Sequence, residues 1–216
     1  MDLREALSKI DFLNKIDEIV KVQEEPVAGP SIVMQYVVFE KAKSIGCKVM
    51  LDGQGGDETL LGYERYYPSY LLSLPFKQKI TEFFNASENS KLSKSQLIAY
   101  TFYFIIARLR KLRLLKRNNF IKKEMLNKVR WKLLDKLALS YRNIFSLQKL
   151  EITETQMPHL LRYEDKNSMA HSVEARLPFI DYQLLETTLS LPNNFKIYNG
   201  WTKYLLRKSV EKLIPS

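Results

Sequence analysis

The chain has 216 residues, of which 45% are hydrophobic, with only 7 glycines and 8 prolines. This length and composition fit one domain, or a large part of one, and exclude collagen-like and low-complexity proteins. The single cysteine, Cys47, excludes an internal disulfide and favours a reducing compartment, so we expect a cytoplasmic protein. The longest apolar block, residues 97–107, predicts a buried helix and no membrane span, because a spanning helix needs about 20 apolar residues.

The formal charge of +10 is concentrated in one stretch, because residues 108–136 carry twelve Lys and Arg against two acidic residues. Such a stretch can attract nucleic acid, anionic lipid or an anionic partner, but solvated helix faces are its usual origin. Few aromatic residues interleave the basic ones beyond Phe120 and Trp131, so base stacking has little support. We expect no nucleic-acid partner and keep a basic helical nucleic-acid-binding module as an alternative.

The first predicted element is a helix over residues 3–22, where apolar residues recur at helical spacing. Residues 24–30 interrupt the pattern with two prolines and a glycine. Ser31 is then expected to cap a second, mostly buried helix over residues 32–45, which Gly46 should end.

A short strand over residues 47–51 follows and feeds the Gly-rich loop of residues 52–58, after which we expect a helix to resume. Helix, strand, Gly-rich loop and helix together form one half of a parallel α/β unit. Ligands of such units bind at the carboxyl ends of the strands. The loop is therefore the first place to look for chemistry.

The chain from residue 75 onward is predicted to be largely helical. The predicted helices cover residues 93–116, 120–139, 146–161 (with Pro158 inside it or at a kink), 181–189 and 202–213. A polar, motif-rich segment lies between residues 162 and 181. The sequence thus predicts an α/β, mostly helical protein in three parts: residues 1–74 with the Gly-rich loop, the basic helical part 75–150, and the motif-bearing helical part 151–216.

The Gly-rich loop combines features that suit a bound phosphate. Glycines 53, 55 and 56 let the backbone approach a ligand, and successive N–H groups before a helix form an anion cradle. Asp57 and Glu58 would repel a bare phosphate, so a bridging Mg²⁺ makes best sense of them. A tight strand-to-helix turn with Asp57 as the N-cap is an equal alternative from the loop alone.

Two further segments carry candidate residues. In the segment of residues 162–181, Glu174 can pair with Arg176, and Arg162 can pair with Asp165. We favour a structural salt-bridge role for Glu174, Arg176 and Asp181, because buried charges are usually paired. In the segment of residues 201–207, Lys203 lies one helical turn before Arg207 and could stabilise developing phosphate charge, although a surface lysine is the commoner case. The two histidines and one cysteine give no zinc set.

Together these segments resemble the synthetase domain of the glutamine-hydrolysing asparagine synthetase family. The matching motifs are residues 51–63 (L-S-G-E-G-x-D-E-x-x-x-G-Y), Glu25-Pro26 with Pro30-Ser31 (E-P…P-S), residues 162–169 with 173–181 (R-x-x-D-K/R-x-x-M and V-E-x-R-x-P-F-L-D) and residues 203–207 (K-x-x-L-R). Four motifs in the right order, over most of residues 24–210, make the resemblance specific.

The resemblance implies a fold and a reaction. The fold would be a partial adenine nucleotide alpha hydrolase-like (Rossmann-like) parallel sheet unit with a large helical portion. ATP would activate the side-chain carboxylate of aspartate as an acyl-adenylate with release of pyrophosphate. Ammonia, supplied from glutamine by a partner glutaminase domain, would then form the amide of asparagine. For the full-length protein a homodimer is left open.

The resemblance also implies roles for individual residues. Asp52 and Gly53 would lie against the adenylate part of ATP, with Gly55 and Gly56 in the same cofactor-binding loop. Asp57, with Glu58, would hold Mg²⁺. As catalytic residues, Lys203 would stabilise charge on the α-phosphate and Gln54 would lie beside the acyl-adenylate.

The sequence also departs from the family pattern. Gln54 stands where many members carry Glu, and Asp52 where many carry Ser; Gln cannot act as a base. The family's S-G-G-x-D-S loop and the glutaminase domain are not in this sequence, so we expect a fragment of a longer product, inactive and poorly soluble alone. A related amide synthetase acting on another carboxylate, from a surface polysaccharide, a peptide or a small molecule, stays open.

Overall fold

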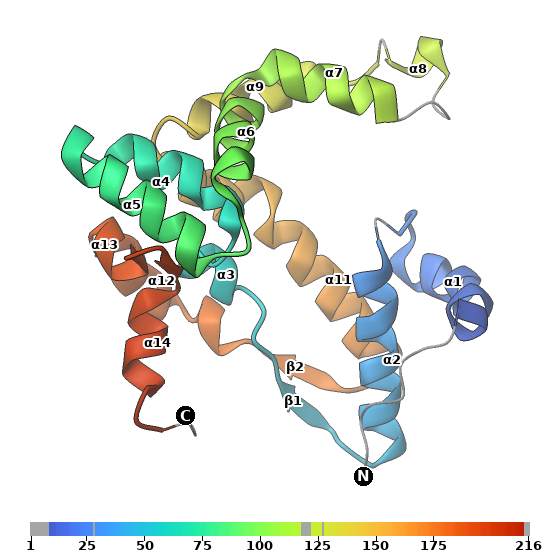
Figure 1. Ribbon diagram of the computed structural model, residues 1–216. Helices are drawn as coiled ribbons and strands as arrows, with labels where there is room; N and C mark the ends of the chain where they lie inside the picture. Colours follow the sequence, from blue (N-terminus) through green and yellow to red (C-terminus); the bar gives the residue numbers. More distant parts are fainter. Residues whose placement is uncertain (1–8, 28, 118–121, 127, 214–216) are drawn as a thin grey trace. The chain divides into compact units, whose positions relative to one another are not determined.

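The computed structural model describes residues 9–27, 29–117, 122–126 and 128–213, and it is dominated by helices (Figure 1). The chain forms two compact units. The first consists of Met1–Gly55 and Gln156–Asp181, and the second of Gly56–Thr155 and Tyr182–Ser216. Both units are discontinuous in sequence. The three consecutive parts expected from the sequence stay a prediction.

The first unit packs three helices with a small parallel sheet. Its elements are α1 (Lys9–Gln23), α2 (Pro30–Ser44), β1 (Val49–Leu51), α11 (Met157–Ala170), β2 (Glu174–Arg176) and the 3-10 turn η3 (Pro178–Ile180). Strand β1 pairs in parallel with β2, so Leu51 lies opposite Arg176. The parallel pairing expected after the α2 helix is confirmed, but its partner strand comes from the segment described above only as polar and motif-rich.

Helix α2 shows how the local sequence sets its ends. It begins at Pro30, and Gly29 before it is extended and makes no side-chain cap. The expected cap at Ser31 is wrong, because proline is already suited to the first helical turn. The C-terminus follows the prediction: the chain leaves the helix after Ser44, and Gly46 takes a φ of +78° that disfavours other residues.

Apolar residues of α1 and α2 form the core of the first unit. Ile19, Val33 and Tyr36 are buried, and Tyr163 of α11 packs against them. A second small cluster joins Phe39 of α2 to Val173, just before β2. The sheet is therefore covered by α2, the helix that leads into β1.

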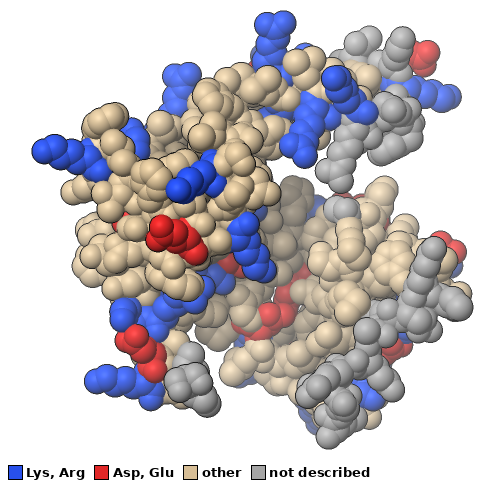
Figure 2. Space-filling model, in the orientation of Figure 1, with Lys and Arg blue, Asp and Glu red and all other residues tan. Residues whose placement is uncertain are grey.

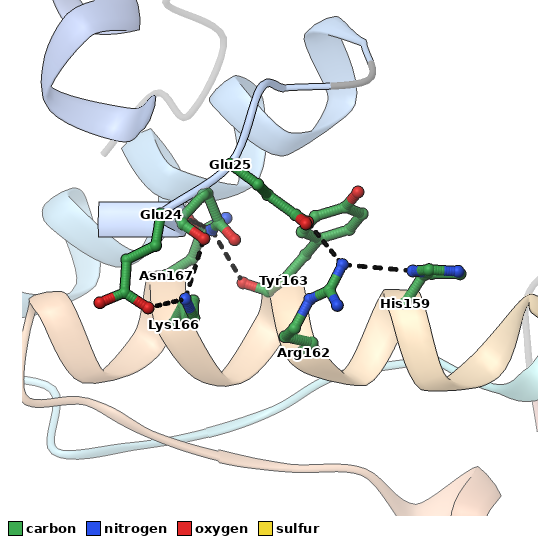
Figure 3. A network of polar contacts seen from close by, with 8 residues as sticks. Glu24, Glu25, His159, Arg162, Tyr163, Lys166 and Asn167 are labelled. Carbon is green, nitrogen blue, oxygen red and sulfur yellow. Dashed lines mark hydrogen bonds and ion pairs between the residues drawn. The ribbon is translucent and has the colours of Figure 1, made fainter. Parts of the chain in front are cut away.

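Figure 3 shows how the turn after α1 is held on α11. Lys166 Nζ donates to Glu24 Oε2 at 2.6 Å, and Arg162 donates to Glu25 Oε1 at 2.5 Å. The expected pairing of Arg162 with Asp165 is wrong, because Arg162 reaches across to the turn instead of along its own helix. Two of the motif segments, around residues 25 and 162, thus contact each other.

The second unit is helical apart from one hairpin. Its elements are α3 (Gly56–Thr59), the 3-10 turn η1 (Glu64–Tyr66), α4 (Tyr67–Ser73), α5 (Phe76–Asn89), α6 (Lys94–Ile105), α7 (Ala107–Arg117), α8 (Lys123–Leu126), α9 (Trp131–Ser140), α10 (Ile144–Leu150), the π-helical segment η2 (Glu151–Thr155), α12 (Tyr182–Ser190), α13 (Asn193–Lys196), β3 (Ile197–Tyr198), β4 (Trp201–Thr202) and α14 (Tyr204–Val210). Its core gathers tyrosines 66, 67, 70 and 141 with leucines 61, 97 and 147.

Several predicted helices of this unit are shorter than expected. The predicted helix over residues 93–116 begins with a capping box at Ser93, as its sequence favours, but it breaks at Ile106, whose backbone is extended. The predicted helix over residues 120–139 is divided between α8 and α9. No proline or glycine marks either break, so the helical periodicity alone overestimated the lengths.

The helices near the motifs also differ from the predictions. The predicted helix over residues 146–161 ends at Leu150, and α11 begins at Met157 with Pro158 in its first turn, where a missing N–H costs nothing. Helix α3 after the Gly-rich loop has only 4 residues, and Leu61 follows it with a φ of +53°. The hairpin β3–β4 was not predicted and delays the last helix to Tyr204.

The basic stretch lies on helices of the second unit. Figure 2 shows Lys and Arg side chains projecting from α7. Some of these cations cover aromatic rings: Lys111 Nζ lies 4.6 Å from the centre of the Trp131 ring. This contact makes Trp131 less open to the base stacking that the alternative function would use, while Phe120 lies outside the described residues. Among the residues that the structure describes, no helix is both long enough and apolar enough to cross a membrane.

Candidate functional site

The Gly-rich loop begins where β1 ends, in the first unit. The N–H of Asp52 donates to the carbonyl of Arg176 at 2.9 Å, which extends the β1–β2 ladder by one bond. Gly55 has a φ of +88°, and a Cβ there would lie 2.5 Å from Cγ2 of Ile180. Both the positive φ and the lack of room for a Cβ therefore require glycine at position 55. A Cβ on Gly53 would meet nothing within 4 Å, so the backbone there is open on that side.

A buried carboxyl group, Glu164 of α11, lies beside this loop. Its side chain is held by Gln35 Nε2 at 2.5 Å and Gln54 Nε2 at 3.4 Å, both donating to Oε2. The residue is only 1% exposed. Burial, then the neighbouring Asp52 carboxyl, raises the pKa of Glu164 to about 8. Nothing in the sequence alone distinguished Glu164 from the other charged residues of the 162–169 motif; the available signal was a charged residue one turn from apolar positions on α11.

Asp57 and Lys203 form an ion pair in the second unit. Lys203 Nζ lies 2.8 Å from Asp57 Oδ1, and the two side chains keep 30% and 36% of their surface exposed. Lys203 precedes α14 with a φ of +51°, a strained conformation for a residue other than glycine. Two predicted site residues from distant motifs are thus in direct contact, and both remain accessible to a ligand.

Gly62 makes that ion pair possible, although the sequence analysis assigned it no role. A Cβ on Gly62 would lie 1.8 Å from Asp57 Oδ1 and 2.3 Å from Lys203 Cε. Any larger residue would occupy the space of the pair. The available signal was the glycine before Tyr63 in the motif; its reason becomes visible only when Lys203 is placed.

Glu58 faces the interior, unlike its neighbour Asp57. It is 0% exposed, and its Oε1 accepts a hydrogen bond from the hydroxyl of Tyr63 at 2.7 Å. Burial raises the pKa of Glu58 above the usual carboxyl range. The alternative in which Asp57 caps the helix is wrong, because α3 begins at Gly56 and includes Asp57 in its first turn.

A buried polar chain supports α3 from behind. The side-chain amide of Gln148 donates to the carbonyls of Glu58 at 2.9 Å and Thr59 at 2.7 Å. Its oxygen accepts from Lys196 Nζ at 2.9 Å, and burial lowers the pKa of Lys196 to about 8. These contacts satisfy two carbonyls at the end of a four-residue helix, and so fix the direction of the chain after Asp57.

The remaining candidate residues take exposed positions. Glu174 and Arg176 pair at 2.7 Å as expected, with about 60% of each side chain exposed, so this pair lies at a surface of the described chain. Arg207 lies over the ring of Trp201, 5.0 Å from its centre, and donates to the carbonyl of Thr202. Among the residues that the structure describes, no group of three His, Cys, Asp or Glu could hold a metal by itself.

Comparison with known proteins identifies the family of this chain. Residues 4–216 match the family described as asparagine synthase. The chain belongs to the asparagine synthase family. Glutamine-hydrolyzing asparagine synthetase 1 of Bacillus subtilis is 26% identical over 238 residues, covering 99% of this chain and 36% of that protein. A putative glutamine-hydrolyzing asparagine synthetase of Mycobacterium tuberculosis is 27% identical over 239 residues, covering 99% of this chain and 34% of that protein.

The chain therefore spans about a third of the length of these curated relatives. A shorter match, 39% identical over 69 residues, is to the amidase chry2 of Gibberella zeae and covers 28% of this chain and 10% of that protein. No solved structure matches the chain. The fold is mostly helical with a small parallel sheet, consistent with an α/β fold.

Proposed function

We propose that the protein is an ATP-dependent amide-forming ligase that activates the side-chain carboxylate of aspartate as an acyl-adenylate and converts it to asparagine with glutamine-derived ammonia. The ion pair of Asp57 with Lys203 at 2.8 Å carries the proposal. It joins two family motifs far apart in sequence, it stays accessible, and a strained backbone and a space-restricted glycine maintain it.

Lys203 is assigned the charge-stabilising role. During adenylation, negative charge builds on the α-phosphate, and a cation held in advance near that charge lowers the barrier. Its positive φ supports this role, because strain of this kind persists where the surroundings fix a functional side chain. Asp57 holds the ammonium group in place through the 2.8 Å ion pair.

Asp57 is assigned the magnesium-binding role. Mg²⁺ usually takes one or two carboxylates with phosphate oxygens and water, and a partly exposed aspartate after a Gly-rich loop fits that donor set. The ion would neutralise phosphate charge when bound. Glu58 fits less well, because its carboxyl group is buried and engaged by Tyr63, so the magnesium proposal rests on Asp57.

The nucleotide-binding role is assigned to the loop after β1, with Asp52, Gly53, Gly55 and Gly56. The loop follows the carboxyl end of a parallel strand, where nucleotides bind in open α/β sheets, and the backbone at Gly53 is unobstructed. An adenine nucleotide alpha hydrolase-like arrangement is part of this proposal. Gln54 is assigned a position beside the activated carboxylate.

The direct test is pyrophosphate release by the protein as its gene encodes it, with ATP, Mg²⁺ and either aspartate or a panel of other carboxylates. We expect aspartate-dependent release, and asparagine formation with glutamine or ammonium as the nitrogen source. Release with a different carboxylate alone would replace the substrate, and no release with any carboxylate would refute the ligase assignment. Lys203→Ala should lower the rate by about 10²–10³-fold. Lys208→Ala, which removes an exposed pair with Glu211 on the same helix, is the matched control.

A further inference from the structure

Amide formation requires a proton acceptor near the reacting carbon. The lone pair of ammonia forms the new C–N bond, the C–O bond to AMP breaks with its electrons leaving on AMP, and the nitrogen must lose one proton. A positioned side chain that takes this proton contributes about 10²–10⁴-fold to such reactions. The inference below rests on the proposed function and concerns only this second step.

The residues already assigned to the loop do not provide such an acceptor. Gln54 carries an amide, which does not ionise. Asp57 is paired with the ammonium of Lys203, and Glu58 is bonded to Tyr63. A group that accepts the proton must therefore come from another element.

The carboxyl group of Glu164 meets the geometric requirements. Its Oε2 accepts the hydrogen bond of the Gln54 amide, so the carboxyl lies directly against the residue assigned to the activated carboxylate. Its Oε1 is buried and receives no hydrogen bond from any described residue. A buried carboxyl oxygen without a donor is costly unless it carries or exchanges a proton.

We propose that Glu164 is the catalytic residue that accepts the proton from the attacking nitrogen, with Asp52 as its partner in a carboxyl pair. Two neighbouring carboxylates resist double ionisation, so a proton is held more tightly on the pair than on an isolated carboxylate. This makes the pair a stronger base than a solvated glutamate. Gln35 from α2 and Gln54 from the loop are neutral and fix the direction of Oε2.

The charged surroundings agree with this role. Asp52 is the charged group that faces Glu164 and, together with burial, it raises the pKa of Glu164 to about 8. With hydroxylamine as the nucleophile, which is already neutral in this range, amide formation should therefore increase as the pH rises through about 8. The dependence should disappear when the carboxyl group is removed.

The experiment compares two reactions in the protein as its gene encodes it. Carboxylate-dependent ATP–pyrophosphate exchange reports adenylation alone, and hydroxamate formation from hydroxylamine reports the amide-forming step. Glu164→Gln should keep exchange within about 3-fold and lower hydroxamate formation by about 10²–10⁴-fold. Gln54→Glu combined with Glu164→Gln exchanges the carboxyl and amide across the same hydrogen bond, and it should recover at least 10-fold of the loss.

Each outcome decides between the two proposals. Hydroxamate formation at the unmodified rate and pH dependence in Glu164→Gln would overturn the role of Glu164 and leave the ligase function standing. Equal loss of both reactions in a folded variant, without recovery in the exchanged pair, would overturn it as well, because Glu164 would then only hold the loop. Absence of exchange in the unmodified protein would overturn the proposed function, and this inference with it.

Discussion

Replacing Gly62 by alanine tests whether the Asp57–Lys203 pair is the reacting centre. The added Cβ would lie 1.8 Å from Asp57 Oδ1, whereas such contacts are essentially never shorter than about 3.0 Å, so the carboxylate must move by more than about 1 Å. Lys203 Cε, 2.3 Å from the same position, must move as well. The 2.8 Å ion pair cannot survive both displacements.

The two consequences of this change differ in size. Both side chains are about one-third exposed and can swing outward, so stability should fall by only about 1 kcal/mol, at the low end for overpacking. A misplacement of about 1 Å in a catalytic constellation costs roughly 10²-fold in rate. We therefore expect aspartate-dependent pyrophosphate release to fall about 100-fold in a protein that still folds.

Gly29→Ala is the matched control, because a Cβ there meets nothing within 4 Å and its backbone is extended. Pyrophosphate release should be measured in both variants under saturating ATP, alongside a denaturant titration of each. A folded Gly62→Ala protein that releases pyrophosphate at the unmodified rate would refute the argument that this ion pair is where phosphate chemistry occurs.

The positive φ of Lys203, the buried Gln148–Lys196 contact and the raised pKa of Glu164 each lead to a further prediction. Lys203→Gly and Lys203→Ala should both lose activity, but denaturant titration should find the glycine variant more stable by about 1 kcal/mol, since only glycine relieves the φ of +51°. Gln148→Leu should lower the free energy of unfolding by about 3–5 kcal/mol in the same assay, because it leaves the Lys196 ammonium buried without its partner. The control Gln78→Leu, at an exposed position, should change the free energy of unfolding by no more than about 0.5 kcal/mol. Glu164 binds its proton more tightly in the folded chain than in the unfolded chain, so the free energy of unfolding should fall as the pH rises from 4.5 to about 8. Denaturant titrations across that pH range should show a shallower fall for Glu164→Gln than for the unmodified protein.

The sequence predicted the starts and ends of helices and strands wherever neighbouring residues determine them. The strand before the loop, the end of α2 just before Gly46 and the start of α6 after Ser93 each follow from a few adjacent residues. The motif order drew attention to Asp57 and Lys203, and the structure brings their side chains into direct contact. What failed was helix length: α6 ends before Ile106 with no proline or glycine nearby, and the predicted helix over residues 146–161 is interrupted after Leu150 by the π-helical segment η2, just before Pro158.

The roles of Glu164 and Gly62 were beyond the reach of the sequence for a different physical reason. Glu164 is one charged residue among many until α11 buries it against Gln35 and the loop, and its raised pKa arises only from that burial and from Asp52. Gly62 needs no unusual φ; it is required because the side chains of Asp57 and Lys203 occupy the space of a Cβ. Both features therefore depend on contacts between residues more than 100 positions apart in the sequence, Gln54 with Glu164 and Asp57 with Lys203.

The backbone strain at Lys203 shows how these long-range contacts are maintained. A lysine with a φ of +51° costs about 1 kcal/mol or more relative to an ordinary conformation, and an ion pair that is about one-third exposed returns about the same amount at most. The pair therefore does not stabilise the fold enough to explain the strain. The hairpin β3–β4 leads directly into Lys203, and Gln148, which is bonded to Lys196, holds the carbonyls of Glu58 and Thr59 just after Asp57. A conformation that gains so little stability is best explained by the position in which it holds the ammonium group.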